Sequence, residues 1–364
     1  MVAMLLLIAA ALTAGLSGHV DVQRVPASGI QPLTVVAPDG VVHMVYYTGD
    51  EGHGDLYYVH SQSSGWSAPM RVNSQPGSAI AVGSIRGARL ALAPGGIIHV
   101  AWNLANRPSA MIYTRLLPGA KAFDPERDVS GPNPAIDGGG ALAADSQGNV
   151  YVFWHAPLPN TQGEAGRRVW LARSRDNGAT FEMPRVAWDA PVGACGCCGM
   201  NAYAYDGAVY VLFRSAQEVV HRDMYLLTSR DSGATFTGRK AAEWNIGACV
   251  MSSSAFAASA SVVEAAWETE RQVYFSPTSL ATPPTPAPGP GGARRYPALA
   301  RNAQGETLLA WTEGMGWKKG GALAWQLFDP SGHPEGPEGH APNVPVWSFP
   351  AVIARPSGAF VIYY

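Results

Sequence analysis

The sequence predicts an all-β protein built from repeated four-stranded antiparallel units, and three observations support this fold class. A pattern of two short strands around a turn recurs seven times along the 364 residues. Two eight-residue segments, 174–181 (SRDNGATF) and 229–236 (SRDSGATF), differ only at their fourth position. No sustained helical periodicity occurs outside the N-terminus. A repeated, helix-free chain of this kind is typical of one ring-shaped domain.

Each repeat starts with a short apolar strand, passes through a turn and continues into a second strand that carries aromatic residues. A third strand follows in most copies, and a fourth strand follows in some, for instance at 185–188. Four antiparallel strands in roughly fifty residues correspond to one propeller blade. We therefore predict a single β-propeller domain over residues 19–364, with seven blades by repeat count. The seven copies cover residues 33–47, 89–103, 141–155, 201–214, 254–268, 297–311 and 349–364.

The two ends of the chain are predicted to meet in one blade. The last copy stops after two strands, and residues 20–25 precede the first copy without a hairpin of their own. Residues 20–25 are therefore expected to supply an outer strand to the last blade. This arrangement closes the ring and removes exposed sheet edges.

The two eight-residue segments contain all the parts of a self-contained turn. The Asp side chain accepts hydrogen bonds from N–H groups just downstream, and the Gly provides a position with positive φ. The Ser and Thr hydroxyls close the turn, and the Phe is buried beneath it. The pattern Ser-x-Asp-x-Gly-x-Thr-aromatic resembles the Asp-box of sialidases and related β-propellers. This resemblance implies a sialidase-like propeller in which the Asp-box is a structural turn away from the substrate. Sialidases have six blades, so six is the alternative to the count of seven.

Composition is that of a turn-rich β protein, with 14% charged residues, 41 Gly and 29 Pro. The net charge of −2 provides no basic surface, so no nucleic-acid partner is expected. A proline-rich segment, residues 276–297, is predicted to be an extended loop that replaces the fourth strand of the fifth blade.

Residues 1–18 form an apolar run with small residues at its end, which predicts a secretory signal peptide. The run is too short to favour stable membrane insertion, although an uncleaved N-terminal anchor is the alternative. We therefore expect a soluble protein that is secreted or periplasmic.

One face of the predicted ring collects the candidate functional residues. Strands one and two of a blade are antiparallel, so the start of the first and the end of the second lie on the same face. Ligands of propellers usually bind on this channel face, at the mouth of the central channel. The expected partner is a glycan or another small ligand bound there.

All four cysteines fall on this face, in two segments that share the sequence Gly-Ala-Cys one repeat apart. Cys195 and Cys249 thus occupy equivalent positions on adjacent blades, close to Cys197 and Cys198. In an oxidising compartment disulfides are expected, for example Cys195 or Cys197 bonded to Cys249. A vicinal Cys197–Cys198 bridge is a rarer arrangement. The alternative is a soft-metal site for copper or zinc on the four thiolates.

The resemblance to sialidases also implies a set of catalytic roles. Sialidases bind the substrate carboxylate with three arginines, a task suited to bidentate guanidinium groups. They use a Tyr–Glu nucleophile pair and an Asp acid/base. The family's Tyr-Arg-Ile-Pro motif resembles residues 294–297 (RRYP) and 23–26 (QRVP), and residues 49–55 resemble the acid-bearing loop in outline. The implied candidates are Arg24, Arg89 and Arg295 as carboxylate clamp, Tyr296 with Glu313 or Glu268 as nucleophile pair, and Asp50 as acid/base.

Three function hypotheses follow from these candidates. The first is a non-catalytic propeller that binds a glycan or another ligand on its channel face. The second is an exo-α-sialidase-like glycoside hydrolase that uses the residues named above. The third is a metal or redox site built on the four cysteines.

Overall fold

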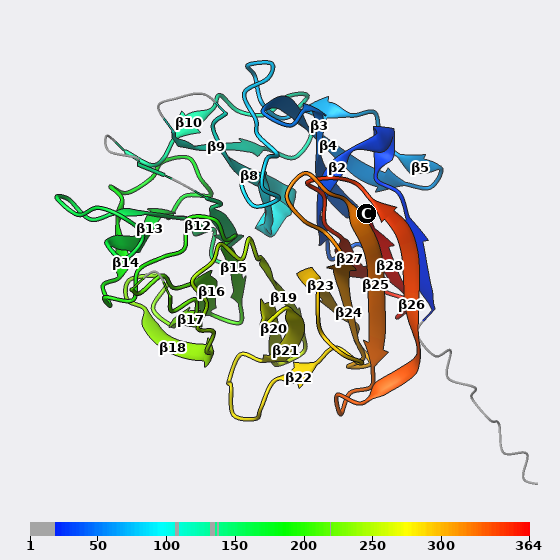
Figure 1. Ribbon diagram of the computed structural model, residues 1–364. Coiled ribbons are helices and arrows are strands. Elements are labelled where there is room, and N and C mark those ends of the chain that lie inside the picture. The colour runs from blue at the N-terminus through cyan, green and yellow to red at the C-terminus, as the bar shows by residue number, and fades with distance from the viewer. Residues whose placement is uncertain (1–18, 106–108, 132–134, 137, 219) are drawn as a thin grey trace, which may run out of the picture.

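A computed structural model describes residues 19–105, 109–131, 135–136, 138–218 and 220–364. These residues form seven β-sheets arranged as blades around a central channel, which confirms the predicted seven-bladed β-propeller (Figure 1). The predicted signal peptide, residues 1–18, lies outside the described residues. No helix within the described part of the chain is long and apolar enough to cross a membrane.

In blades 1 to 6 the first strand borders the channel and the later strands follow outward in antiparallel order. Blades 1 to 3 contain β2 (Ile30–Val36), β3 (Val42–Asp50), β4 (His53–Gln62), β5 (Gly65–Trp66) and β6 (Met70–Arg71); β7 (Arg89–Ala93), β8 (Ile97–Asn103), β9 (Met111–Leu116) and β10 (Arg127–Asp128); and β11 (Ala141–Ala144), β12 (Val150–Pro157), β13 (Arg167–Ser174) and β14 (Arg185–Trp188). Blades 4 to 6 contain β15 (Asn201–Tyr205), β16 (Ala208–Arg214), β17 (Met224–Ser229) and β18 (Thr237–Ala242); β19 (Ser254–Ser259), β20 (Val262–Thr269), β21 (Gln272–Pro277) and β22 (Thr285–Pro286); and β23 (Arg294–Arg301), β24 (Thr307–Glu313), β25 (Gly321–Phe328) and β26 (Pro334–Val344).

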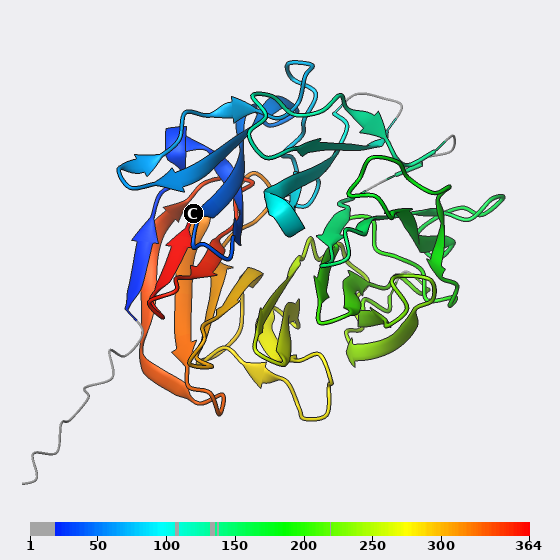
Figure 2. The same cartoon turned by 180° about the vertical axis from the view of Figure 1, so that it is seen from behind.

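The seventh blade closes the ring with strands from both ends of the chain. It consists of β27 (Ala351–Ala354), β28 (Phe360–Tyr363) and β1 (Val20–Gln23). Strand β1 lies parallel to β28, and Figure 2 shows this blue strand beside the red C-terminal hairpin. The predicted closure is therefore confirmed. Strand β28 is thereby hydrogen-bonded along both of its edges, to β27 and to β1, so it is not a free edge of the sheet.

The proline-rich segment differs from its prediction. Residues 276–297 were expected to replace the fourth strand of the fifth blade, but they contain the short strand β22, which pairs with β21. Thr285 lies opposite Phe275, and Pro286 lies opposite Tyr274. A proline is tolerated here because β22 is the outermost strand, where a missing N–H does not interrupt the sheet.

Apolar side chains of the strands fill the spaces between neighbouring blades. Four blades place a tryptophan near the end of their second strand, and each of these side chains is at most 1% exposed: Trp102, Trp154, Trp267 and Trp311. Large buried aromatic side chains contribute most of the burial free energy in such a core. The aromatic ends of the second strands in the sequence repeat are thus explained by packing between blades.

Both Asp-box segments form the predicted turn. In the first, Asp176 Oδ1 accepts hydrogen bonds from Ser174 Oγ (2.7 Å) and from the Thr180 N–H (2.8 Å). Asp176 Oδ2 accepts one from Thr180 Oγ1 (2.6 Å). Desolvation acts to raise the pKa of Asp176, but the hydrogen bonds from Thr180 and Ser174 outweigh it and lower this pKa to about 2. Phe181 packs edge-on against Tyr113 of the preceding blade, with ring centroids 4.7 Å apart.

The second Asp-box allows a direct test of how much this turn stabilises the ring. Asp231 accepts hydrogen bonds from Ser229 Oγ (2.7 Å), the Thr235 N–H (2.9 Å) and Thr235 Oγ1 (2.5 Å). Asp231→Ala is expected to lower the free energy of unfolding by about 2 kcal/mol, because the lost bonds are partly replaced by water at this exposed site. Urea denaturation measures the change. The matched control is Asp189→Ala, which removes one ion pair of a 74% exposed side chain and is expected to cost less than about 0.5 kcal/mol. Equal effects of the two substitutions would contradict this prediction.

Candidate functional site

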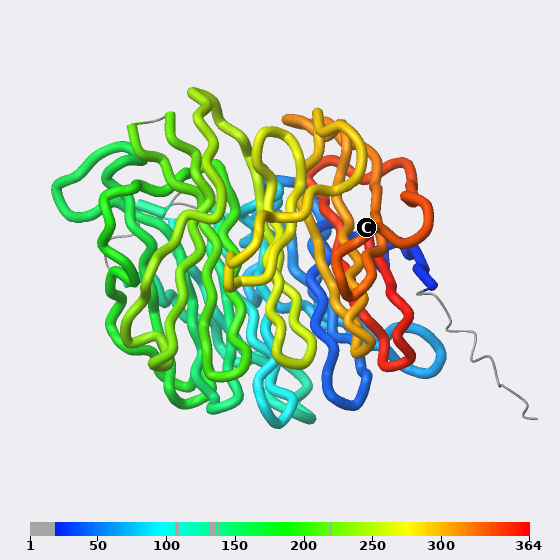
Figure 3. The backbone as a smooth tube through the Cα atoms, turned by 90° about the horizontal axis from the view of Figure 1, so that it is seen from below, coloured from blue at the N-terminus to red at the C-terminus, as the bar shows by residue number. Residues whose placement is uncertain are grey.

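The central channel forms a cavity of about 1140 Å³, lined by the first strands of all seven blades. Figure 3 shows the ring from the side, with the strands running between its two faces. This volume is slightly above the range of small-molecule sites, roughly 300–1,000 Å³. The channel is therefore large enough to admit a small organic ligand.

One wall of the channel carries three aromatic side chains in a continuous stack. The Tyr203 ring lies 6.1 Å from the Tyr205 ring at an interplanar angle of 14°, and 6.1 Å from the Phe256 ring at 18°. All three side chains are half-buried, and all three residues line the cavity. They come from the first strands of blades 4 and 5. Tyr203 and Tyr205 lie on the same side of β15 because alternate residues of a strand point to the same side. All three rings also pack against the apolar core between blades 4 and 5.

Polar groups at the starts of the first strands and in the loops before them line the channel-face end of the cavity. They include Ser84, Arg89, Asn201 and Ser253. Asn201 Nδ2 donates a hydrogen bond to the Ser254 carbonyl at 2.8 Å, and the side-chain oxygen of Asn201 takes no part in that bond. The cavity thus combines an aromatic wall with hydrogen-bonding groups at one end.

The three arginines of the predicted carboxylate clamp bind different partners. Arg89 donates from Nε, Nη1 and Nη2 to the carbonyls of Gly140 (2.7 Å), Ala88 (2.8 Å) and Ile85 (3.0 Å). Burial lowers the pKa of Arg89 to about 10. Each nitrogen of the guanidinium group therefore makes a hydrogen bond, and Arg89 links the loop before blade 2 to the start of blade 3.

Arg24 and Arg295 also contact different groups. Arg24 donates to the carbonyls of Asn343 (2.8 Å) and Pro342 (3.0 Å) on β26, and its guanidinium lies 3.9 Å above the Tyr364 ring. Arg295 Nε instead lies 4.0 Å from Glu268 Oε1. The described contacts therefore do not bring the three guanidinium groups together.

Glu268 and Tyr296 belong to one buried polar cluster near the channel-face end of the ring. Glu268 is 0% exposed, and Tyr296 is 3% exposed with a φ of 51°. Desolvation raises the pKa of Glu268 to about 7, although the positive charges of Arg214 and Arg295 oppose this shift. The pKa of Tyr296 is also raised, first by burial and further by the charges of Glu268 and Cys198.

Glu313 and Asp50 lie in other surroundings. Glu313 Oε1 accepts hydrogen bonds from Arg294 Nε (3.0 Å) and Trp311 Nε1 (2.9 Å). Of the two glutamates considered for Tyr296, Glu268 is thus the one whose charge acts on that hydroxyl. Asp50 stands at the end of β3 with its side chain 70% exposed, and it accepts a hydrogen bond from the Gly52 N–H within its own turn (2.9 Å).

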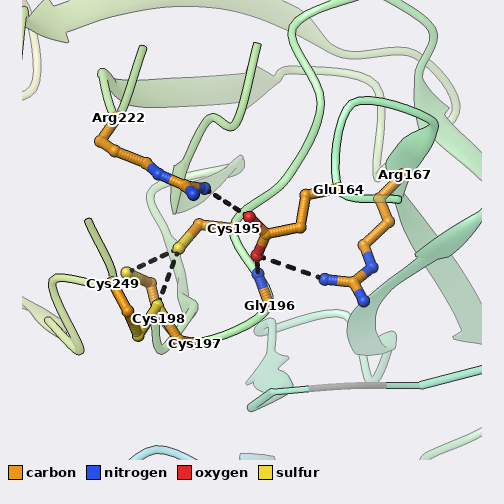
Figure 4. Close-up of a disulfide and its surroundings, with 8 residues drawn as sticks. All are labelled: Glu164, Arg167, Cys195, Gly196, Cys197, Cys198, Arg222 and Cys249. Carbon is orange, nitrogen blue, oxygen red and sulfur yellow. Dashed lines mark hydrogen bonds and ion pairs between the residues drawn. A yellow bond between two sulfur atoms is a disulfide. The ribbon is translucent and has the colours of Figure 1, made fainter. Parts of the chain in front are cut away.

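The cysteines form a compact sulfur cluster between the loops that enter blades 4 and 5 (Figure 4). Cys197 and Cys249 form a disulfide with a Cα–Cα distance of 6.2 Å, which is the predicted link between these blades. Cys195 and Cys198 are free and buried. Cys195 Sγ lies 3.3 Å from Cys197 Sγ and 3.1 Å from Cys198 Sγ. The sulfur atoms of Cys195, Cys197 and Cys198 all lie within 4.8 Å of one another and could hold a metal ion.

Two charged residues that the sequence did not indicate hold this cluster in place. Glu164, from the loop between β12 and β13, accepts a hydrogen bond from the Gly196 N–H at 2.5 Å. Its other carboxylate oxygen lies 2.7 Å from Arg222 Nη1, and Figure 4 shows both side chains beside Cys195. Because Glu164 and Arg222 sit in irregular loops of different blades, no local pattern distinguishes them from ordinary surface charges.

Comparison with known proteins extends the structural description. No family model and no curated protein matches the chain. Among solved structures, the chain is similar to an α-L-arabinanase of Penicillium chrysogenum complexed with arabinobiose (TM-score 0.55, 11% identity, covering 85% of this chain and 95% of that chain). It is also similar to the Trypanosoma rangeli sialidase in complex with the inhibitor DANA (0.52, 10%, 79% and 53%) and to the Aleuria aurantia lectin in complex with α-methyl-L-fucoside (0.51, 11%, 88% and 96%). The chain thus shares its propeller fold with glycoside hydrolases and a lectin.

Proposed function

We propose that this protein is an exported, sialidase-like propeller that binds a glycan in its central channel. The observation that carries the proposal is the aromatic stack of Tyr203, Tyr205 and Phe256 in the wall of the 1140 Å³ cavity. One face of a sugar ring consists of C–H groups and packs against flat aromatic surfaces. Its hydroxyl groups need hydrogen-bonding partners, which Asn201 and Ser253 offer near the end of the same cavity.

Export is supported by the Cys197–Cys249 disulfide. Disulfides persist in extracellular and periplasmic compartments and are rare in the reducing cytosol. The similar solved structures include proteins complexed with arabinobiose and with a fucoside, which favours carbohydrate as the ligand class.

The test is binding to a library of defined glycans, followed by calorimetric titration of the best ligand. Tyr203→Ala is expected to weaken the binding constant by at least about tenfold, because the middle ring of the stack is removed. The matched control is Tyr57→Ala, which removes a half-buried tyrosine from β4, outside the cavity lining. The control is expected to bind like the wild type. Failure of every glycan to bind, or unchanged affinity in Tyr203→Ala, would refute the proposal.

Sialidase-like hydrolysis is a second candidate, and one observation favours it. The charge of Glu268 raises the pKa of Tyr296, whose hydroxyl is hydrogen-bonded to Ser84, so the two candidate residues share one electrostatic environment. The burial of both side chains and the backbone bonds of Arg89 speak against an open catalytic pocket. Release of fluorophore from a fluorogenic sialoside, lost in Tyr296→Phe, would support hydrolysis; no release supports binding alone.

A further inference from the structure

The sulfur cluster has an outer part that solvent reaches and an inner part that it does not. Cys249 is exposed and Cys197 is half-buried, so their disulfide stands at the surface of the channel face. Cys195 and Cys198 are 1% and 2% exposed and lie directly beneath it. One sulfur contact between the two layers joins Cys195 to Cys197 at 3.3 Å.

The surroundings of the inner pair suit an ionised sulfur. Cys195 donates its S–H to Cys198 Sγ at 3.1 Å, and the positive charge of Arg214 also favours the thiolate of Cys198. Burial acts to raise the pKa of Cys198, but these two interactions outweigh it and lower the pKa. The pKa of Cys195 is raised, first by this hydrogen bond and then by burial. Cys195 is thus the hydrogen-bond donor of the inner pair, and Cys198 is the acceptor.

We propose that the four cysteines form a thiol–disulfide relay, in which the buried dithiol of Cys195 and Cys198 exchanges with the exposed Cys197–Cys249 disulfide. The relay couples the buried cluster to solvent through Cys249. Its partner in solution is a protein or small molecule that carries a dithiol or a disulfide.

The exchange takes place in two balanced steps. First, Cys195 Sγ bonds to Cys197 Sγ as its proton passes to Cys198; the Cys197–Cys249 bond breaks, and its electron pair leaves on Cys249, which takes up a proton from water. Second, Cys198 loses its proton and bonds to Cys195 Sγ, and Cys197 leaves with the electron pair of the Cys195–Cys197 bond and is protonated. Starting from the thiolate of Cys198, two electrons have then moved from the inner to the outer pair, together with the one proton of Cys195 and one proton from water, and no oxidant or reductant is consumed.

The sulfur distances favour exchange over a metal centre. Ligands of a tetrahedral zinc with Zn–S bonds of about 2.3 Å lie about 3.8 Å apart. Cys195 Sγ lies only 3.3 Å and 3.1 Å from its two sulfur neighbours. Cys197 is moreover already bonded to Cys249, so only two thiols remain to bind a metal.

The test is alkylation of the folded, full-length protein with N-ethylmaleimide in the absence of reductant, followed by peptide mass mapping. The relay predicts that Cys249 becomes labelled while a Cys195–Cys198 or Cys195–Cys197 bridge accumulates. Cys195→Ser removes the attacking sulfur and is expected to slow the labelling of Cys249 at least tenfold. Cys198→Ser removes the proton acceptor of the first step and the attacking sulfur of the second, so it is expected to form the Cys195–Cys197 bridge alone and more slowly than the wild type.

Three results would overturn the relay. One is direct labelling of Cys195 and Cys198 in the wild type with the outer disulfide intact. Another is equal labelling rates at Cys249 in wild type and Cys195→Ser, with Cys198→Ser keeping its outer disulfide. The third is stoichiometric zinc or copper in protein purified without added metal, measured by plasma mass spectrometry together with four reduced thiols. Thermal denaturation of each variant confirms that the labelled protein is folded.

Discussion

Glu268→Gln is expected to stabilise the protein by about 3 kcal/mol at pH 8 and to remove most of the dependence of its stability on pH between 5 and 8. The reason is that Glu268 is fully buried and its pKa is raised from 4.5 to about 7 by desolvation. Each unit of pKa difference between the folded and unfolded states corresponds to about 1.4 kcal/mol. Glutamine keeps the shape of the side chain but carries no charge to desolvate.

The sign follows from proton binding. Below pH 4.5 the carboxyl is protonated in both states and has no effect on stability. Between pH 4.5 and 7 the unfolded chain releases the proton while the folded protein keeps it, so the stability falls as the pH rises. Above about pH 7 the loss is complete. The wild type is therefore expected to be less stable at pH 8 than at pH 5 by about 2 to 3 kcal/mol from this group alone.

Urea denaturation of both proteins at pH 5 and pH 8 measures this difference. The control is Glu243→Gln, an exposed glutamate, which is expected to leave the pH profile unchanged. Parallel profiles for the wild type and Glu268→Gln would show that the buried carboxyl is ionised at the same pH in the folded and unfolded states.

Gly178→Ala is expected to destabilise the protein by about 4 kcal/mol. Gly178 has a φ of +75°, and a Cβ placed on it would lie 1.7 Å from the hydroxyl oxygen of Tyr113 in the preceding blade. Tyr113 cannot move without losing its 2.6 Å hydrogen bond to the buried His99. The expected cost adds backbone strain of about 1 kcal/mol to displacement of a buried aromatic side chain, about 3 kcal/mol.

Gly207→Ala separates these two contributions. Gly207 has a similar φ of +71°, but no atom lies within 4 Å of the Cβ position. Its substitution is expected to cost about 1 kcal/mol from backbone strain alone. The midpoints of urea denaturation of both variants measure the comparison, and equal shifts would mean that contact with Tyr113 contributes nothing.

The two Asp-boxes show how much of the structure a local sequence pattern predicts. The hydrogen bonds among Ser174, Asp176 and Thr180 follow from a pattern of eight residues, and the structure contains them. The pattern explained the Gly by its backbone conformation only. The structure adds a second reason, the approach of Tyr113 from the preceding blade, and such a contact between distant segments leaves no mark within the motif.

For the candidate site residues, the sequence predicted less than the tertiary structure shows. The sequence placed Glu268 and Glu313 on the channel face as equal candidates to face Tyr296, because both follow a second strand. The charge of Glu268 acts on Tyr296, whereas Glu313 bonds to Arg294 and Trp311. The direction of a side chain at a strand end depends on the register of the neighbouring strands. Beside Tyr296, the pairing of β23 with β24 shifts register between Arg295 and Ala298.

The sequence by itself determined the all-β class, the number of blades, the closure by the N-terminal strand and the proximity of the cysteine segments. These features depend on strand periodicity, turn residues and repeat spacing, which are local properties counted along one chain. Only the tertiary structure decided which cysteines are bonded, which arginines are engaged by backbone carbonyls, and that three aromatic rings stack in the channel. Those outcomes depend on distances between different blades, and such distances are set by packing after the ring has closed.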